Sequence, residues 1–402
     1  MDKKRAVRQE KSLLRTWNWF RNSGVMLPAD GTWGVAERII LTSGNSALEK
    51  TLDSFPAWTL SKNHCIIEQR RADCNMQTAY LFLKLHEQFG STLYPFRETA
   101  GNILDFLYFK SGLLHRNGPG NFPGCWEWSH IKFSNTIYFD DNAWMVTLPL
   151  KIARKFPALD KKYEMSRYAL LLADTLAEEA PLYLNDTPPE KSAFPFRGNI
   201  HLPHWGSLVC MALAEAYRKE PKEEYLSFID LYEDFLLEKN SNFTGSEFAY
   251  AILGATSSFY VAKREKSRKV AEFFARNLLD RMDPHSGCIP SEHYEAPSGK
   301  ALADTIYTIN WAVLALQNMA RLDDCCQEPF QKLLTLLLNI QDTSRAKYLQ
   351  GCWRGMFDLE NNQWGGGDRY EGGANSIYTG WTNAPIAWAM VFDLLRSSLM
   401  ED

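Results

Sequence analysis

The chain has 402 residues, of which 45% are hydrophobic and 13% aromatic, which is enough for a large buried core. Its 44 basic and 48 acidic residues leave a formal net charge of -4 without a long basic run, so neither nucleic acid nor a membrane surface is an expected partner. No apolar run approaches the roughly 20 residues that a membrane-spanning helix needs.

The N-terminal segment and the cysteines indicate the compartment. Residues 1–20 begin with basic side chains but contain no uninterrupted apolar stretch and no small-residue cleavage site, so they predict an amphipathic helix and not a signal peptide. The eight cysteines show no CxxC pairing, which is typical of reduced, mostly buried thiols in a long chain. We therefore expect a cytoplasmic protein.

Helical periodicity and its stop signals predict about twelve helices. In chain order they span residues 3–22, 73–90, 97–111, 138–156, 160–179, 203–219, 222–238, 246–260, 265–281, 302–322, 326–341 and 379–398. Strand signals are weak, and short strands are expected only in the long connections near 33–42, 112–134 and 350–370.

Long and short connections alternate along this series of helices. Such alternation is what a ring of helical hairpins produces, with the long loops on the face that usually carries function. The even-numbered helices also lack charge over most of their length, as helices buried on all sides do. The sequence therefore predicts an all-α fold, a single (α/α)6 toroid of six hairpins over residues 1–402, with the even-numbered helices inside.

In such a fold the residues at the start of each inner helix line one cleft. Polar, acidic and aromatic residues are concentrated at these positions, a mixture that suits carbohydrate because rings stack on aromatic planes while hydroxyls take hydrogen bonds. The candidate substrate-binding residues are Arg70, Arg71, Asp73, Asn75, Tyr138, Trp144, His201, His204, Trp205, Glu247, Glu292, Asp304, Tyr307, Trp311, Tyr378 and Trp381. Asn142 and Asn383 are further polar residues at such positions.

Asp140 and Asp141 are the candidate catalytic residues. Glycosidic cleavage usually needs two carboxyl groups in different protonation states, and repulsion between neighbouring carboxylates separates their pKa values. A structural alternative exists, because one aspartate can cap the helix while the other is a solvated first-turn acid. The apolar helix that follows, and the aromatic residues around the pair, favour the functional interpretation.

The segments YFDDNAWMVTLPLKIARKF (138–156) and KKYEMSRYALLLADTL (161–176) resemble the central part of glycoside hydrolase family 76, the endo-α-1,6-mannanases. The resemblance implies an (α/α)6 fold and places the nucleophile and the general acid/base of that family on Asp140 and Asp141, with Trp144 as the matching aromatic residue. Met145 stands where that family usually has a second aromatic residue. The run MVTLPLKIA (145–153) also resembles a Met…Pro…Leu pattern in the unsaturated glucuronyl hydrolases, which belong to the wider six-hairpin glycosidase superfamily.

These observations predict a metal-independent glycoside hydrolase that acts on an oligosaccharide or glycoside and needs no cofactor, and they set no oligomeric state. His201 and His204 have no evident third ligand for a metal. Two alternatives stay open. One is a sugar epimerase or isomerase of the N-acylglucosamine 2-epimerase type that uses His201, His204 or His293, and the other is a non-catalytic glycan-binding toroid.

One acidic and two basic residues at these positions can have either a functional or a structural role. Asp304 can be a helix cap or an acid in the cleft. Arg70 and Arg71 can bind an anionic sugar or form ion pairs with nearby carboxylates.

Overall fold

The computed structural model describes residues 3–42, 48–55, 57–90, 92–116, 123–131, 136–185, 196–239, 243–292, 302–365 and 375–402. Its contacts divide the chain into two compact units. Unit 1 comprises Met1–Phe106 and Leu279–Leu399, and unit 2 comprises Leu107–Leu278 and Met400–Asp402. No helix among the described residues combines the length and the apolar character needed to cross a membrane.

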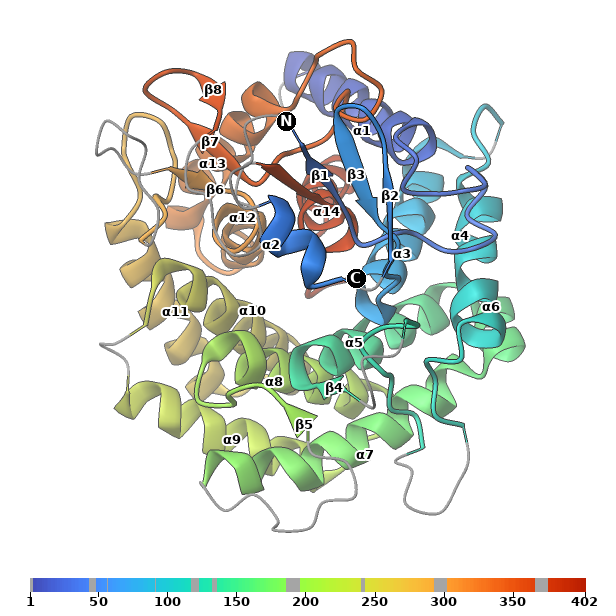
Figure 1. Ribbon diagram of the computed structural model, residues 1–402. Coiled ribbons are helices and arrows are strands. Elements are labelled where there is room, and N and C mark those ends of the chain that lie inside the picture. Colours follow the sequence, from blue (N-terminus) through green and yellow to red (C-terminus); the bar gives the residue numbers. More distant parts are fainter. Residues whose placement is uncertain are drawn as a thin grey trace. The chain divides into compact units, whose positions relative to one another are not determined.

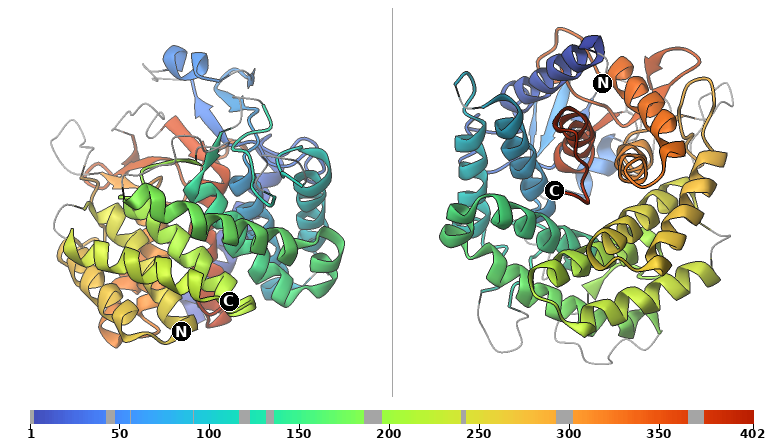
Figure 2. Two further views of the ribbon diagram at one scale, coloured as in Figure 1. Left: turned by 90° about the horizontal axis from the view of Figure 1, so that it is seen from below. Right: turned by 180° about the vertical axis from the view of Figure 1, so that it is seen from behind.

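Unit 1 is built from helices and two small sheets (Figure 1). Its helices are α1 (Lys3–Asn22), α2 (Leu48–Asp53), α3 (Ala72–Phe89), α4 (Phe96–Asp105), α12 (Ile309–Met319), η2 (Asp324–Cys326), α13 (Gln327–Ile340), the π-helix η4 (Thr379–Asn383) and α14 (Ala384–Leu395). Helix α14 packs against both α3 and α12, and Figure 2 shows it between them from behind.

The larger sheet of unit 1 joins the two chain segments of the unit. Its strand order is β2 (Trp58–Leu60), β3 (His64–Ile67), β1 (Arg38–Leu41) and β9 (Ser376–Tyr378), and all its pairs are antiparallel. Arg38 lies opposite Ile67 on one side and Tyr378 on the other. The second sheet has the order β6 (Ala303–Asp304), β7 (Met356–Asp358) and β8 (Gln363–Trp364).

Unit 2 consists of consecutive helices with one two-stranded sheet. Its elements are β4 (Ile137–Tyr138), α5 (Phe139–Lys155), α6 (Pro157–Tyr163), α7 (Met165–Leu184), β5 (Phe196–Arg197), α8 (Pro203–Lys219), α9 (Glu223–Glu238), α10 (Gly245–Ala262) and most of α11 (Glu265–Asp280). The π-helix η1 (Phe106–Lys110) precedes them at the boundary with unit 1. Helix α8 packs against α5 on one side and α10 on the other.

Burial separates two classes of helix, as the sequence predicts. Helices α3, α12 and α14 in unit 1, and α5, α8 and α10 in unit 2, are buried over most of their length. Helices such as α4 and α11 bury one stripe and expose charged residues on the other face. The even-numbered predicted helices are thus the buried ones, which confirms the predicted distribution of apolar residues.

The predicted elements differ from the structure in several places. The helix expected over 160–179 is two helices, because Glu164 adopts a left-handed conformation with φ of 55° that ends α6, and α7 begins at the next residue. The helix expected from residue 302 begins at Ile309, after strand β6 and a turn. The short helix α2 was not predicted at all.

Candidate functional site

The first turns of α5, α8 and α10 lie at the same end of unit 2. Strands β4 and β5, which lead directly into α5 and toward α8, run parallel with Tyr138 opposite Arg197. At the start of the next helix pair, a side chain in the first turn of α8 bonds a side chain in the first turn of α10, as described below for His204 and Glu247. The residues of these three first turns therefore gather at one end of the unit.

Asp140 and Asp141 lie in the first turn of α5, where the partial positive charge of a helix N-terminus favours carboxylates. Asp140 keeps 8% of its surface exposed and Asp141 keeps 2%. The N-cap position of the helix is Tyr138, whose side chain makes no capping bond. The solvated first-turn acid of the structural alternative does not match this burial.

His204 and Glu247 form a close pair between α8 and α10. The Glu247 Oε1 atom lies 2.5 Å from His204 Nδ1, and Glu247 Oε2 accepts a hydrogen bond of 2.7 Å from the His204 backbone N–H. The two side chains keep 23% and 12% of their surface exposed. A carboxylate can only accept a hydrogen bond, so this contact requires a proton on Nδ1, and in the neutral tautomer Nε2 is then the acceptor.

Trp205 and His201 lie beside this pair but differ in their surroundings. The rings of His204 and Trp205 are 3.6 Å apart between centroids. Gly198, with φ of +116°, makes room for the Trp205 indole, since an added Cβ would lie 2.5 Å from its Nε1. His201 lies within hydrogen-bond distance of the Asn199 side chain and the Leu184 carbonyl through its two ring nitrogens, so it holds the end of α7 in place.

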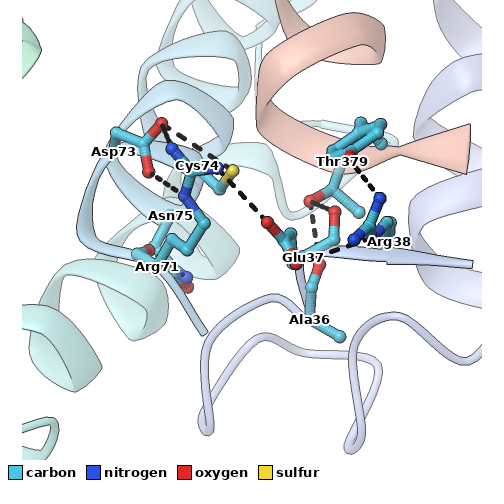
Figure 3. A network of polar contacts seen from close by, with 9 residues as sticks. Ala36, Glu37, Arg38, Arg71, Asp73, Cys74, Asn75 and Thr379 are labelled. Atoms are coloured by element: carbon cyan, nitrogen blue, oxygen red, sulfur yellow. Dashed lines mark hydrogen bonds and ion pairs between the residues drawn. The ribbon is translucent and has the colours of Figure 1, made fainter. Parts of the chain in front are cut away.

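In unit 1, residues at the start of α3 and in η4 form a second cluster together with Glu37. Arg71 makes two parallel bonds of 3.0 Å to the Asp73 carboxylate and one of 3.2 Å to Glu37, as Figure 3 shows. Its guanidinium also lies over the Trp381 ring at 5.6 Å. Arg71 is therefore engaged by two carboxylates and an aromatic face, which favours the ion-pair interpretation of this arginine.

The two neighbouring arginines are paired as well. Arg70 bonds Glu68 at 3.0 Å and the Trp33 carbonyl at 2.7 Å. Arg38 lies between the Phe55 and Tyr378 rings, each 4.7 Å away, and donates to the Tyr378 hydroxyl.

Sequence reasoning missed Glu37 and Arg38. The available signal was a pair of opposite charges within an apolar run, because such residues are rarely buried unless they are paired.

The remaining predicted residues of unit 1 have structural surroundings. Asp304 accepts the backbone N–H groups of Ile306 and Tyr307 at 2.8 and 3.1 Å, so it caps the turn before α12. Glu292 forms a surface ion pair of 3.0 Å with Arg281.

Trp144 in unit 2 and Trp311 in unit 1 are both fully buried. Their rings pack within the protein, and neither can stack on a sugar as it stands. His293 lies outside the described residues.

Asn75 uses its whole side-chain amide on the backbone. Its Oδ1 accepts from the Val35 N–H at 2.7 Å, while its Nδ2 donates to the carbonyls of Val35 and Arg71 at 3.0 and 2.8 Å. This arrangement fixes the start of α3 and uses both amide hydrogens on the protein's own backbone. Within the described ranges, no three His, Cys, Asp or Glu side chains come together as metal ligands would.

Comparison with solved structures decides the fold class. An unsaturated glucuronyl hydrolase from Bacillus sp. GL1, responsible for the degradation of glycosaminoglycan, matches with a TM-score of 0.61 and 13% identity over 97% of this chain and 96% of that one. A sugar epimerase from a ruminal bacterium matches with a TM-score of 0.62 and 9% identity over 98% and 99%.

An alpha-1,6-mannanase from Salegentibacter sp. HEL1_6 matches with a TM-score of 0.56 and 9% identity over 96% and 99%. That structure is an inactive variant with two consecutive aspartates replaced by alanine, in complex with alpha-1,6-mannotetrose.

The chain therefore has the fold of the six-hairpin glycosidase superfamily. This confirms the predicted all-α (α/α)6 fold, and the resemblance to family 76 holds at the level of the fold. No protein-family model matches the chain, and no curated protein matches it either. Because one fold hosts both hydrolases and epimerases among these structures, the activity has to be argued from the site.

Proposed function

We propose that this protein is a carbohydrate-active enzyme, and specifically a glycoside hydrolase that cleaves a short glycan with Asp140 and Asp141. The observation that carries the proposal is the position of the two carboxylates, which are buried in the first turn of α5 where the first turns of α8 and α10 also lie. Hydrolysis needs one carboxyl group to donate a proton to the leaving oxygen and a second to act as nucleophile or base.

The solved structures of the same fold support this proposal. They comprise enzymes that act on sugars, and in the mannanase variant two consecutive aspartates have been replaced in an inactive protein that still holds its oligosaccharide. The sequence segment around Asp140 resembles that family. A neutral or charged oligosaccharide is therefore the substrate class to test first.

Substitution of each aspartate tests the proposal. The variants Asp140→Asn and Asp141→Asn should each lose at least a thousandfold in turnover on a glycan panel, because one of the two required groups is gone. Asp234→Asn is the matched control, since Asp234 is 70% exposed on α9. If both variants of the pair cleave glycans at the rate of the control, the assignment is wrong.

A second candidate function, sugar epimerisation or isomerisation, is favoured by the pair of His204 and Glu247. A histidine whose Nδ1 is held by a carboxylate presents Nε2 as a proton acceptor, as abstraction of a proton from a sugar carbon requires. Several structures of the same fold are sugar epimerases or isomerases.

Exchange with solvent separates the two functions. When reducing sugars are incubated in deuterated water, an epimerase introduces deuterium at carbon without release of a glycosidic fragment, and His204→Asn abolishes this exchange. A hydrolase instead releases reducing ends without carbon-bound deuterium. The measurement is mass spectrometry of the recovered sugars.

A further inference from the structure

The side chain of Asn142 joins the first turn of α5 to the loop that precedes it. Its Oδ1 accepts from the Trp126 backbone N–H at 2.8 Å, and its Nδ2 donates to the Trp126 carbonyl at 3.0 Å. The same Nδ2 donates to the Tyr138 carbonyl at 2.9 Å. One buried amide thus pairs with both backbone groups of a loop residue, as a neighbouring strand would, and also closes the first turn of its own helix.

The arrangement is repeated at two other inner helices, and we call it the asparagine bracket. Asn75 makes the same three bonds with Val35 and Arg71. Asn383 bonds the N–H and carbonyl of Trp353 at 2.8 and 3.1 Å and the Tyr378 carbonyl at 2.6 Å.

The sequence offset of the third bracket has a structural cause. Asn383 reaches a carbonyl five residues back instead of four, because the turn that it closes is the π-helix η4, whose hydrogen bonds span five residues where those of an α-helix span four.

The loop side of the Asn142 bracket is itself held in place. Trp126 pairs with Leu114 in an antiparallel bridge, and the Glu127 N–H donates to the Leu113 carbonyl at 3.0 Å. The Trp126 ring packs edge-on against Tyr108 at 5.2 Å. Asn142 therefore connects the start of α5 to a fixed segment.

Asp140 and Asp141 lie between the two points that this bracket fixes, the carbonyl of Tyr138 and the Cα of Asn142. From this placement we propose that Asn142 is a positioning residue for the reaction: it holds the backbone that orients the two carboxyl groups. This inference rests on the proposed function of the aspartate pair. It gives Asn142 no contact with the substrate, and its effect is exerted on the rate of the chemical step.

The test compares two brackets that make the same bonds. Asn142→Ala and Asn383→Ala each remove three hydrogen bonds to the backbone, so both should lower the free energy of unfolding by a similar amount. Asn142→Ala should lower kcat about 100-fold with KM changed by less than about threefold, because a displacement near 1 Å at reacting groups has such an effect. The kcat of Asn383→Ala should fall at least about tenfold less than that of Asn142→Ala, because the turn that its bracket closes contains no carboxyl group.

Two further readouts separate positioning from general loosening. Asn142→Asp has a side chain of the same size and keeps the bond from the Trp126 N–H, but it loses both donated bonds. It serves as the second variant if Asn142→Ala does not fold, and its kcat should lie between that of the original protein and the value expected for Asn142→Ala. In folded Asn142 variants the limbs of the pH profile of kcat/KM should shift by about half a pH unit, since the placement of the two carboxyl groups has changed. The profile of Asn383→Ala should not shift.

The outcomes are distinguishable. If the folded Asn142 variants keep the original kcat and pH profile while Asp140→Asn and Asp141→Asn are inactive, the positioning role is wrong and the proposed hydrolase stands. An equal loss of kcat in Asn142→Ala and Asn383→Ala also overturns it, because the effect would then reflect stability alone. If the aspartate variants keep activity, the proposed function fails and the positioning role fails with it.

Discussion

The first turns of α3 and α5 are held by the same asparagine bracket but carry different charged residues. The sequences are RADCN (71–75) and YFDDN (138–142), and in both the final asparagine forms a bracket and an aspartate stands two residues before it. In α3 that aspartate is paired twice with Arg71, whereas in α5 the corresponding helix start carries Tyr138 and a second aspartate.

This comparison shows that the position of the turn and the charge of its side chains are determined by different residues. The asparagine and the loop residue that it bonds determine where the first turn lies. The other residues of the turn determine its charge: Asp73 is paired with Arg71, whereas in α5 a tyrosine takes the place of this arginine and a second aspartate follows Asp140.

The comparison predicts opposite phenotypes for equivalent substitutions. Asp140→Asn should lower turnover at least a thousandfold and change the free energy of unfolding by less than about 1 kcal/mol. Asp73→Asn should lower that free energy by about 2 kcal/mol, since Arg71 keeps Glu37 but loses its two-bond partner. Turnover assays and urea denaturation of both variants check this, and equal stability losses would contradict the distinction between the two turns.

A buried ion pair at the other end of α5 offers a test in which stability should be lost without a loss of activity. Lys151 Nζ lies 2.6 Å from Glu215 Oε1 with both side chains buried, and Arg154 lies 3.2 Å from the same carboxylate. Glu215→Gln should lower the free energy of unfolding by about 2 kcal/mol because it leaves Lys151 without its charge partner. Activity per folded molecule should stay unchanged, and a selective loss of kcat would place this end in the active site.

The same pair has a predictable pH dependence. Burial opposes ionisation of Glu215, but Lys151 and Arg154 hold its pKa below the ordinary value of 4.5. The carboxylate then stabilises the fold above that pH, and the contribution is lost as the pH falls further. The difference between the original protein and Glu215→Gln in urea denaturation should therefore shrink below about pH 4.

Glu233 on α9 has a pKa shifted in the opposite direction from that of Glu215. Burial raises its pKa to about 7. Since the unfolded chain releases this proton near pH 4.5, stability should fall by roughly 2 kcal/mol as the pH rises from 5 to 7 and then level off. The isosteric Glu233→Gln should lack this decline, and a variant with the original pH slope would show that another group is responsible.

The smallest expected effect concerns the surroundings of His204. Gly198→Ala adds a Cβ where the Trp205 indole lies, at a residue whose φ of +116° suits glycine. We expect a stability loss of about 1 kcal/mol and a several-fold rise in KM for a glycan, without a change in the pH optimum. An unchanged KM in a folded variant would show that Trp205 does not contact the substrate.

The fold was predictable from the sequence because long helices carry strong periodic signals. Inner helices such as α12 and α14 are apolar on all faces, and this pattern alone separates them from the outer ones. The short strands were mostly missed, because strands of two to four residues leave no period to detect. Strand β9 forms only by pairing with β1, more than 330 residues earlier in the chain.

The site was only partly predictable for a related reason. A first-turn position can be recognised from the sequence, but the partner of a polar side chain depends on tertiary contacts. Asp304 and Asp140 look alike as helix-start acids, and only the structure shows that Asp304 caps backbone N–H groups. The role of Asn142 was equally hidden, since its partner Trp126 lies in a connection without a regular pattern.

The strand order of the larger sheet has a consequence for synthesis on the ribosome. Unit 2 is almost entirely one continuous stretch, whereas unit 1 needs both its early segment and the strand that ends at Tyr378. Strand β1 can pair with β3 early, but because nascent chains emerge from their N-terminus, the other edge of β1 stays without β9 until nearly all of the polypeptide has been translated. The contiguous unit 2 can therefore complete its contacts, apart from those of Met400–Asp402, before the larger sheet of unit 1 is complete.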